Sequence, residues 1–154
     1  MNEKQKNTIS KRVNIVSIKL IKEGSVLYKN RRIKSPADAY ELFKVFLEEK
    51  DREHLVVCSL NIKNEPVSIN VCHIGSLNAS LVSPREIMKT AILSSAASIM
   101  VAHNHPSGDT TESREDVEVT KRLVEAGKLM GIELLDHLII GDGEYISLKE
   151  KGFI

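Results

Sequence analysis

The run Ser98-Ile99-Met100-Val101-Ala102 most constrains the fold, because it has the length and β-branched content of a buried strand. His103 and His105 stand at the carboxyl end of this run. Residues two apart on an extended backbone point to the same side, so both imidazoles face one way. Pro106 and Gly108 then end the strand and begin a polar loop. The sequence therefore predicts a buried strand that presents two adjacent imidazoles at its end.

A carboxylate completes a ligand set with this histidine pair. Asp116 opens the helix that is predicted to follow the loop. Two imidazoles and one carboxylate are a usual set for catalytic zinc, because three protein ligands leave a fourth tetrahedral position for water. Water in that position ionises near neutral pH. The spacing of His103, His105 and Asp116 therefore predicts a hydrolytic site with one metal ion.

The same residues also have a purely structural interpretation. Ser113-Arg114-Glu115-Asp116 has the form of a capping box, with Ser113 as the N-cap and Asp116 returning to its backbone. A His-x-His pair alone is a weak signal, since partly buried histidines often satisfy each other through hydrogen bonds. A His-x-His pair at a strand end together with a Ser-x-x-Asp capping box is far rarer than either pattern alone, and this combination favours a metal site.

The spacing His103, His105, Ser113, Asp116 resembles the signature of the JAMM (MPN+) metallopeptidases. The surrounding segments 102–109 (AHNHPSGD) and 135–143 (LDHLIIGDG) resemble the RadC branch of that superfamily, and the similarity extends over about residues 35–154. The resemblance implies an α/β fold of the JAB/MPN type, with a mixed, mostly antiparallel sheet flanked by helices in a cytidine-deaminase-like layering. Residues 1–34 are expected to form a separate basic extension.

In that superfamily a glutamate from well upstream accepts a proton from the attacking water. The resemblance places this general base at Glu53, between a predicted helix and the strand that follows. Glu48 and Glu49 are the closest alternatives, although a Glu-Glu-Lys run at a helix end is ordinarily solvated. Glu65 falls at the tip of a predicted hairpin, and the first-turn carboxylate of Glu86 is explained by the helix dipole.

The resemblance implies a role for each of these residues. His103, His105 and Asp116 would hold Zn²⁺, and Glu53 would act as general base and then as general acid toward the leaving amine. Ser113 would donate a hydrogen bond to the oxyanion, a contribution of ~3 kcal/mol. The implied function is a zinc-dependent metallohydrolase, a peptidase or isopeptidase, whose peptide or protein substrate the sequence does not identify.

Several other polar residues have two interpretations. His137 lies in a predicted buried strand, where a core position or a hydrogen bond to a metal ligand is expected in preference to a fourth ligand. Asn104 and Asp109 are either supporting groups of the metal site or simple loop residues. His54 and His73 are expected to be structural.

The composition of the 154 residues, with 42% hydrophobic and 28% charged residues, is typical of one globular domain. Cys58 and Cys72 fall in neighbouring predicted strands outside any Cys-x-x-Cys pattern, which indicates reduced thiols. The polar N-terminus has no following apolar h-region, and no stretch approaches the ~20 apolar residues of a membrane span. We therefore expect a cytoplasmic protein without membrane contact.

Charge is distributed unevenly along the chain. Residues 1–34 contain 10 Lys or Arg and only Glu3 and Glu23, a net charge of +8, whereas residues 35–154 carry 12 basic and 19 acidic residues, a net charge of −7. This basic segment stands where longer RadC proteins carry a region resembling a helix-hairpin-helix DNA-binding unit. A weak contact with nucleic-acid phosphates is one interpretation of the basic cluster, and a solvated hairpin that pairs with the acidic body is the other. The cluster consists of Lys29, Arg31, Arg32 and Lys34.

Periodicity predicts the order of the elements. A basic hairpin is expected over residues 13–20 and 26–28, with its turn at residues 22–25. The further elements are a helix over 35–50, strands over 55–60 and 66–74, a helix over 85–95, the strand ending at His103, a helix over 113–130 closed by Gly131, and a hairpin around Gly141–Gly143.

Three functions remain open on the sequence alone. The first is the zinc metallopeptidase or isopeptidase that the motif implies. The second is a DNA-associated RadC-like protein, related to DNA repair or mobile elements, which the basic segment suggests. The third is a scaffold without bound metal, in which the motif serves only as a capped helix and a turn.

Overall fold

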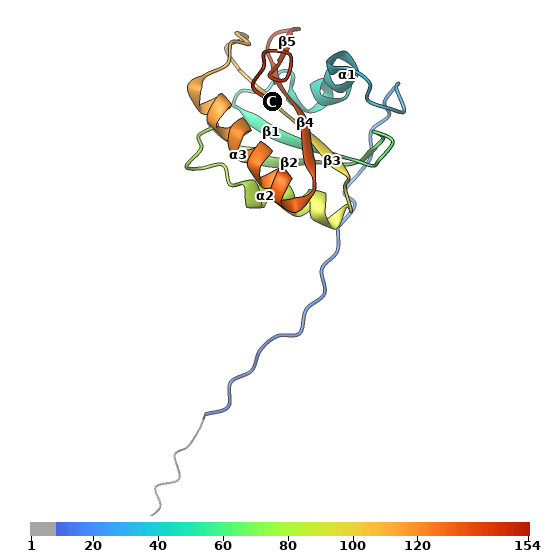
Figure 1. The fold of residues 1–154 in the computed structure, drawn as a ribbon, viewed down its shortest axis with the longest axis vertical. Helices are drawn as coiled ribbons and strands as arrows, with labels where there is room; N and C mark the ends of the chain where they lie inside the picture. Colours follow the sequence, from blue (N-terminus) through green and yellow to red (C-terminus); the bar gives the residue numbers. More distant parts are fainter. Residues whose placement is uncertain (1–8) are drawn as a thin grey trace, which may run out of the picture.

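The computed structural model describes residues 9–154, and a five-stranded sheet with helices on both faces forms its centre (Figure 1). The strand order is β2-β1-β3-β4-β5, in which β3 and β4 run parallel and the other neighbours antiparallel. The predicted α/β class with a mixed, mostly antiparallel sheet is thus confirmed. The elements are α1 (Pro36–Leu47), β1 (His54–Leu60), β2 (Pro66–Ile74), α2 (Pro84–Leu93), β3 (Ser98–Asn104), α3 (Arg114–Met130), β4 (Glu133–Ile140) and β5 (Tyr145–Ser147).

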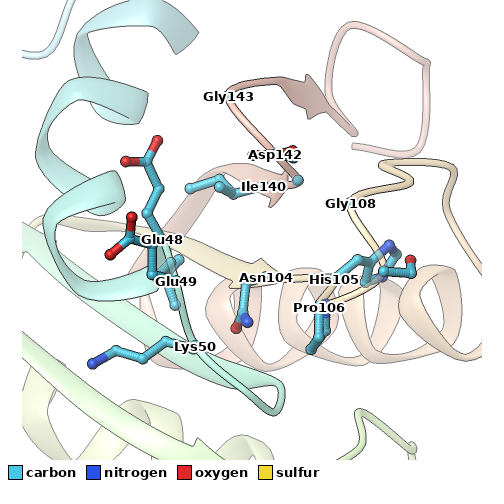
Figure 2. Close-up of a pocket in the computed structure, with 13 residues that line it drawn as sticks. Glu48, Glu49, Lys50, Asn104, His105, Pro106, Gly108, Ile140, Asp142 and Gly143 are labelled. Atoms are coloured by element: carbon cyan, nitrogen blue, oxygen red, sulfur yellow. The ribbon is translucent and has the colours of Figure 1, made fainter.

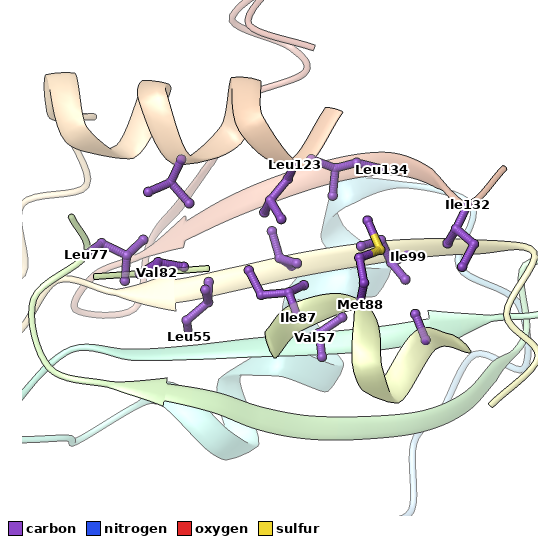
Figure 3. Close-up of a cluster of buried hydrophobic side chains, with 13 residues drawn as sticks. Leu55, Val57, Leu77, Val82, Ile87, Met88, Ile99, Leu123, Ile132 and Leu134 are labelled. Carbon is purple, nitrogen blue, oxygen red and sulfur yellow. The ribbon is translucent and has the colours of Figure 1, made fainter. Parts of the chain in front are cut away.

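The hydrophobic core is divided into two layers by the sheet. Alternate residues of β1 and β3 point to opposite faces, so Val56 and Met100 pack toward α1 while Val57 and Val101 pack toward α2 and α3. Figure 3 shows the layer beneath α2 and α3, where Leu123 packs among residues of the sheet. Because both faces are covered, every residue of β3 is buried, and its sequence is apolar from Ile99 to Ala102.

The helices begin where their caps predict. The Ser35 side chain accepts a hydrogen bond from Asp38 N, and Gly131 closes α3 with φ 69°. Helix α1 ends at Leu47, before the expected end near residue 50, because the C-cap Glu48 is extended with ψ 147° and Glu49 follows with a left-handed φ of 59°. None of the helices within residues 9–154 is both long and apolar enough to cross a membrane.

The hairpin predicted over residues 13–20 and 26–28 is wrong, because residues 9–35 contain neither helix nor strand. Residues 1–8 of the basic segment lie outside the described residues. Apolar alternation indicates a tendency to form a strand, but an isolated two-stranded hairpin without a hydrophobic face to pack on is marginal in water. Packing of the chain on the core begins at Ile33, which is buried and whose backbone N donates to Asn64 O at 2.9 Å.

Candidate metal centre

The two histidines and the aspartate of the sequence motif converge at one end of the sheet. His103 is on β3 and His105 follows that strand, while Asp116 lies in the first turn of α3. The two Nε2 atoms are 3.1 Å apart, Asp116 Oδ1 lies 3.2 Å from His103 Nε2, and Asp116 Oδ2 lies 3.2 Å from His105 Nε2. His103 and Asp116 are buried, and only 13% of the His105 side chain is exposed. These three residues form a group that could hold a metal ion.

The separations between these atoms suit a small tetrahedral ion. Zinc bonds to imidazole nitrogen and carboxylate oxygen are about 2.0–2.2 Å long, which places tetrahedral ligand atoms about 3.3–3.5 Å apart. The three observed separations fall just below that range, so the cluster needs only a slight expansion to accept the ion.

The tautomer of His103 follows from a chain of buried hydrogen bonds. Thr120 Oγ1 donates its single proton to Asp116 O at 2.7 Å, so it must accept the bond of 2.7 Å that joins it to His137 Nδ1. With its proton on Nδ1, neutral His137 accepts at Nε2, and His103 Nδ1 donates to it over 2.7 Å. The lone pair of His103 therefore lies on Nε2, which is the atom that faces Asp116.

His105 is oriented in the same way by a different partner. Its Nδ1 lies 2.7 Å from Asp109 O, and a carbonyl oxygen only accepts, so Nδ1 carries the proton and Nε2 the lone pair. Two bare nitrogens and a carboxylate then meet with no hydrogen between them. A cation at the centre satisfies all three ligand groups.

The pKa values of the cluster agree with this arrangement. The hydrogen bond with Asp116 raises the pKa of His105, with smaller contributions from Asp109 O and Glu53, although partial burial acts in the opposite direction. Burial alone would raise the pKa of Asp116, but the adjacent imidazoles of His103 and His105 hold it well below its usual range. Burial keeps the pKa of His137 well below its ordinary value, so this ring is neutral. The His105 ring therefore binds a proton more tightly than a free imidazole does.

Asp116 serves as a helix cap and as a member of the cluster at once. Ser113 Oγ accepts a hydrogen bond from Asp116 N at 3.1 Å, and Ser113 N donates to Asp116 Oδ2 at 2.8 Å, which completes the predicted capping box. The two interpretations of this sequence are therefore compatible, because the box fixes the carboxylate that faces the histidines. The Ser113 hydroxyl accepts within the box and still has its own proton to donate.

Glu53 precedes β1 and His105 follows β3, so both lie just beyond the paired residues of these antiparallel strands. Leu55 pairs with His103 in the register, and continuing it by two residues places Glu53 beside His105. The loop after β2 holds this glutamate, since Gly75 N donates to Glu53 O at 2.8 Å and Leu77 N donates to Glu53 Oε2 at 2.7 Å. Among the described residues no group hydrogen-bonds the other carboxylate oxygen.

Asn104, between the two histidines, fixes the backbone on both sides of Glu53. Its Oδ1 accepts from His54 N at 2.7 Å, and its Nδ2 donates to Arg52 O at 3.0 Å. The side chain is buried, because β3 alternates and Asn104 points away from the face that carries the histidines. Asn104 therefore ties the position of the predicted base to the strand that carries the predicted ligands.

The alternative glutamates lie farther from the cluster. Figure 2 shows Glu48 and Glu49 at the end of α1, on one side of a cleft of about 330 Å³, with His105 and Pro106 on the other side. Both glutamates are exposed, and Glu48 accepts a hydrogen bond from Tyr40 Oη. Glu65 forms an ion pair with Arg31 at 3.1 Å.

The predicted basic cluster is exposed in the structure. Lys29, Arg31, Arg32 and Lys34 all lie on the surface of the segment that leads to α1. The ion pair between Arg31 and Glu65 joins this segment to the acidic body of the domain.

A sequence profile of the RadC-like JAB domain matches residues 33–153. The chain belongs to this family. A UPF0758 protein of Methanosarcina mazei is 52% identical to this RadC-like JAB domain over 124 residues, which are 80% of the chain and 54% of the relative. A UPF0758 protein of Caldanaerobacter subterraneus is 56% identical over 124 residues, 80% of the chain and 53% of the relative. In a Geobacillus relative of the same description the identity is 51% over 142 residues, 91% of the chain and 63% of the relative. The chain thus spans little more than half the length of the first two relatives.

Two supporting residues of the RadC-like JAB domain were not assigned a definite role from the sequence. The sequence allowed two interpretations of Asn104, a group that supports the metal site or a simple loop residue. The strand register shows that its side chain contacts the backbone beside Glu53. Thr120 could have been identified from the sequence as a neighbour of the site, because it follows Asp116 by four residues and therefore lies on the same face of α3. His137 hydrogen-bonds a predicted ligand, as expected.

Proposed function

We propose that this domain is a zinc-dependent hydrolase that cleaves amide bonds, as a peptidase or isopeptidase. The observation that carries the proposal is the convergence of two unprotonated imidazole nitrogens on a buried carboxylate, with Glu53 immediately before the adjacent strand β1. A purely structural helix cap needs no histidine at this place. The resemblance of the motif to the JAMM metallopeptidases supports the same chemistry.

His103, His105 and Asp116 would hold the metal ion. Zinc bound there would supply Lewis-acid activation of water and of the scissile carbonyl. The hydrogen bonds from the Nδ1 atoms of the two histidines keep the Nε2 lone pairs directed at the ion. Asp116 supplies the negative charge, and its backbone is fixed by the capping box.

Glu53 acts as the proton carrier in this proposal. Its Oε2 is held by Leu77 N, so the carboxylate keeps a defined orientation while its other oxygen takes a proton from the attacking water. The same oxygen then delivers the proton to the leaving amine, which completes the cleavage of the amide bond. Asn104 acts as a positioning residue, because it fixes the backbone on each side of Glu53.

Ser113 stabilises the oxyanion of the tetrahedral intermediate. Its hydroxyl proton is not used in the capping box, where Oγ accepts from Asp116 N. One donor aimed at a developing oxyanion lowers the activation free energy by roughly 3 kcal/mol. Ser113→Ala is therefore expected to lower turnover far more than it lowers metal affinity.

The test has two stages. Elemental analysis of protein purified without a chelator or a metal-binding tag should give about one zinc per chain, and His103→Ala/His105→Ala should remove it. Metal-loaded protein is then screened against peptide and isopeptide libraries, with Glu53→Gln as the inactive control that retains zinc. A protein that takes up no metal even after zinc is supplied contradicts the proposal and favours the scaffold.

A further inference from the structure

We propose that residues 13–21 of one copy add as a strand to the open edge of β2 in a second copy of this chain. The proposal concerns assembly and does not depend on the hydrolase activity proposed above. It accounts for two features that the metal centre leaves unexplained. One is an extended segment with exposed apolar side chains, and the other is a long edge strand that, within residues 9–154, pairs with no strand on its outer side.

The extended segment has the pattern of a strand but no sheet to join. Val16, Ile18 and Leu20 recur at every second residue, so an extended backbone places them on one face. Exposure of the side chains is 76% for Val16, 76% for Ile18 and 44% for Leu20, and Ile15 is fully exposed. Monomeric proteins rarely leave a contiguous apolar stripe of this kind in water. The stripe therefore marks a contact surface.

The edge strand β2 carries a matching stripe. It pairs only with β1 and spans Pro66–Ile74 at one edge of the sheet. Val67, Ile69 and Val71 alternate along it on the α1 side, where Val67 is 49% and Val71 40% exposed. Open edges of this length pair readily with an extended segment of another chain. Three aliphatic side chains on the added strand would meet three on β2.

The path of the chain favours a second copy over the same copy. Residues 20–26 and Tyr28 line a groove of about 780 Å³ together with Leu42, Phe46 and residues 66–70, so this part of the chain already runs beside its own β2. From there it continues away from the domain without turning back (Figure 1). Pairing of residues 13–21 with the same β2 would require the chain to reverse within residues 20–28, whereas a neighbouring copy can accept the segment as it stands.

Charge favours the same partner. Residues 1–34 carry a net charge of +8, and residues 35–154 carry −7. The segment of one copy is therefore attracted to the body of another, and two copies that exchange segments neutralise each other in a closed, symmetric dimer.

The test is the oligomeric state of the full chain by light scattering after size exclusion. Wild type is expected at twice the chain mass across the micromolar range. Val16→Lys/Ile18→Lys in the segment, and separately Val67→Lys/Val71→Lys on the edge, should each reduce the mass to that of one chain. Leu129→Lys, on an α3 side chain that is 85% exposed and far from the edge, should leave the dimer unchanged. Thermal melting confirms that every variant is folded.

A mixing experiment identifies the contact. The variant with the altered segment retains an intact β2 edge, and the variant with the altered edge retains an intact segment. An equimolar mixture should therefore form a dimer through one intact contact. Three outcomes overturn the proposal: a wild-type monomer at all concentrations, a dimer that survives both pairs of substitutions, or hydrogen-exchange protection of residues 13–21 in a monomer. The last outcome would show that the segment folds onto its own copy.

Discussion

His103 Nδ1 lies 2.7 Å from His137 Nε2, and both rings are fully buried. The histidine that would bind metal is thus oriented by a second histidine, which is itself oriented by Thr120. Thr120→Val keeps the shape of the side chain but removes its hydroxyl. We expect zinc affinity to fall by about 10- to 100-fold, the usual effect of losing a partner behind a metal ligand. Competition with a chelator measures this loss.

Thr120→Ser is the matched control for that substitution. It retains the hydroxyl that joins Asp116 O to His137 Nδ1 and should keep most of the affinity. The tautomers can be observed directly, because nitrogen chemical shifts of imidazole distinguish a protonated Nδ1 from a protonated Nε2. A His103 ring with its proton on Nε2 in the metal-free wild type would refute the assignment.

Replacement of Asn104 should separate metal binding from catalysis. Asn104→Ala leaves His54 N and Arg52 O without their buried partner, which costs about 1–3 kcal/mol of stability for an unsatisfied group. Zinc content should remain at the wild-type value, because the three ligands come from other residues. Turnover on a cleaved peptide should fall by at least about tenfold, since Glu53 loses its fixed position. Asn104→Ala with full activity would show that the loop after β2 positions Glu53 on its own.

Zinc affinity should decrease as the pH falls. His105 must lose its proton to bind the metal, and its pKa is raised above the ordinary value of 6.5 by Asp116. Competition from protons therefore extends to a higher pH than for a free imidazole, and zinc affinity should fall through the range around and below this raised pKa. Calorimetry in buffers of different ionisation enthalpy should show protons released on binding. Affinity that is constant across this range would contradict the raised pKa.

Gly141→Ala, in the hairpin between β4 and β5, should displace the loop that follows His105. A Cβ at Gly141 would lie only 2.2 Å from Gly108 O, so the loop after His105 must move. We expect a loss of roughly 1–3 kcal/mol in stability, as for other overpacked sites, together with weaker zinc binding. Chemical denaturation and chelator competition measure the two effects.

Gly143→Ala is the control in the same hairpin. No atom lies within 4 Å of an added Cβ there, although φ is 69°. It should cost about 1 kcal/mol through backbone strain and leave the metal affinity unchanged. Equal loss of affinity in both variants would mean that the hairpin as a whole, and not the contact with Gly108, supports the loop.

The ligand strand and its helix could be predicted from the sequence because both depend on local patterns. A buried strand ending in His-x-His and a capping box at Asp116 are each defined within a few residues. The support for Glu53 could not be predicted in the same way. Asn104 lies about fifty residues from the backbone that it holds, and this contact follows only from the antiparallel register of β1 and β3.

The mistaken hairpin has a different physical origin. Residues 13–20 have the alternation of a strand, but alternation does not identify the neighbour that a strand needs. Residues 13–20 therefore form no strand, because no neighbouring strand pairs with them in the part of the chain that the structure describes. The early end of α1 is also a tertiary effect, because the Glu-Glu-Lys run in the sequence contains no helix breaker.

The parallel pairing of β3 with β4 has a consequence for how this centre could be assembled. A parallel pair requires a crossover, and α3 is that crossover, so His103, Asp116, Thr120 and His137 all belong to one continuous β-α-β unit. Glu53 arrives separately, because it immediately precedes β1. A chain in which β1 is displaced from β3 therefore retains a complete set of metal ligands while lacking its base. Under the proposed function, metal binding and catalysis are therefore separable, and this topology allows a form that binds the metal but is inactive.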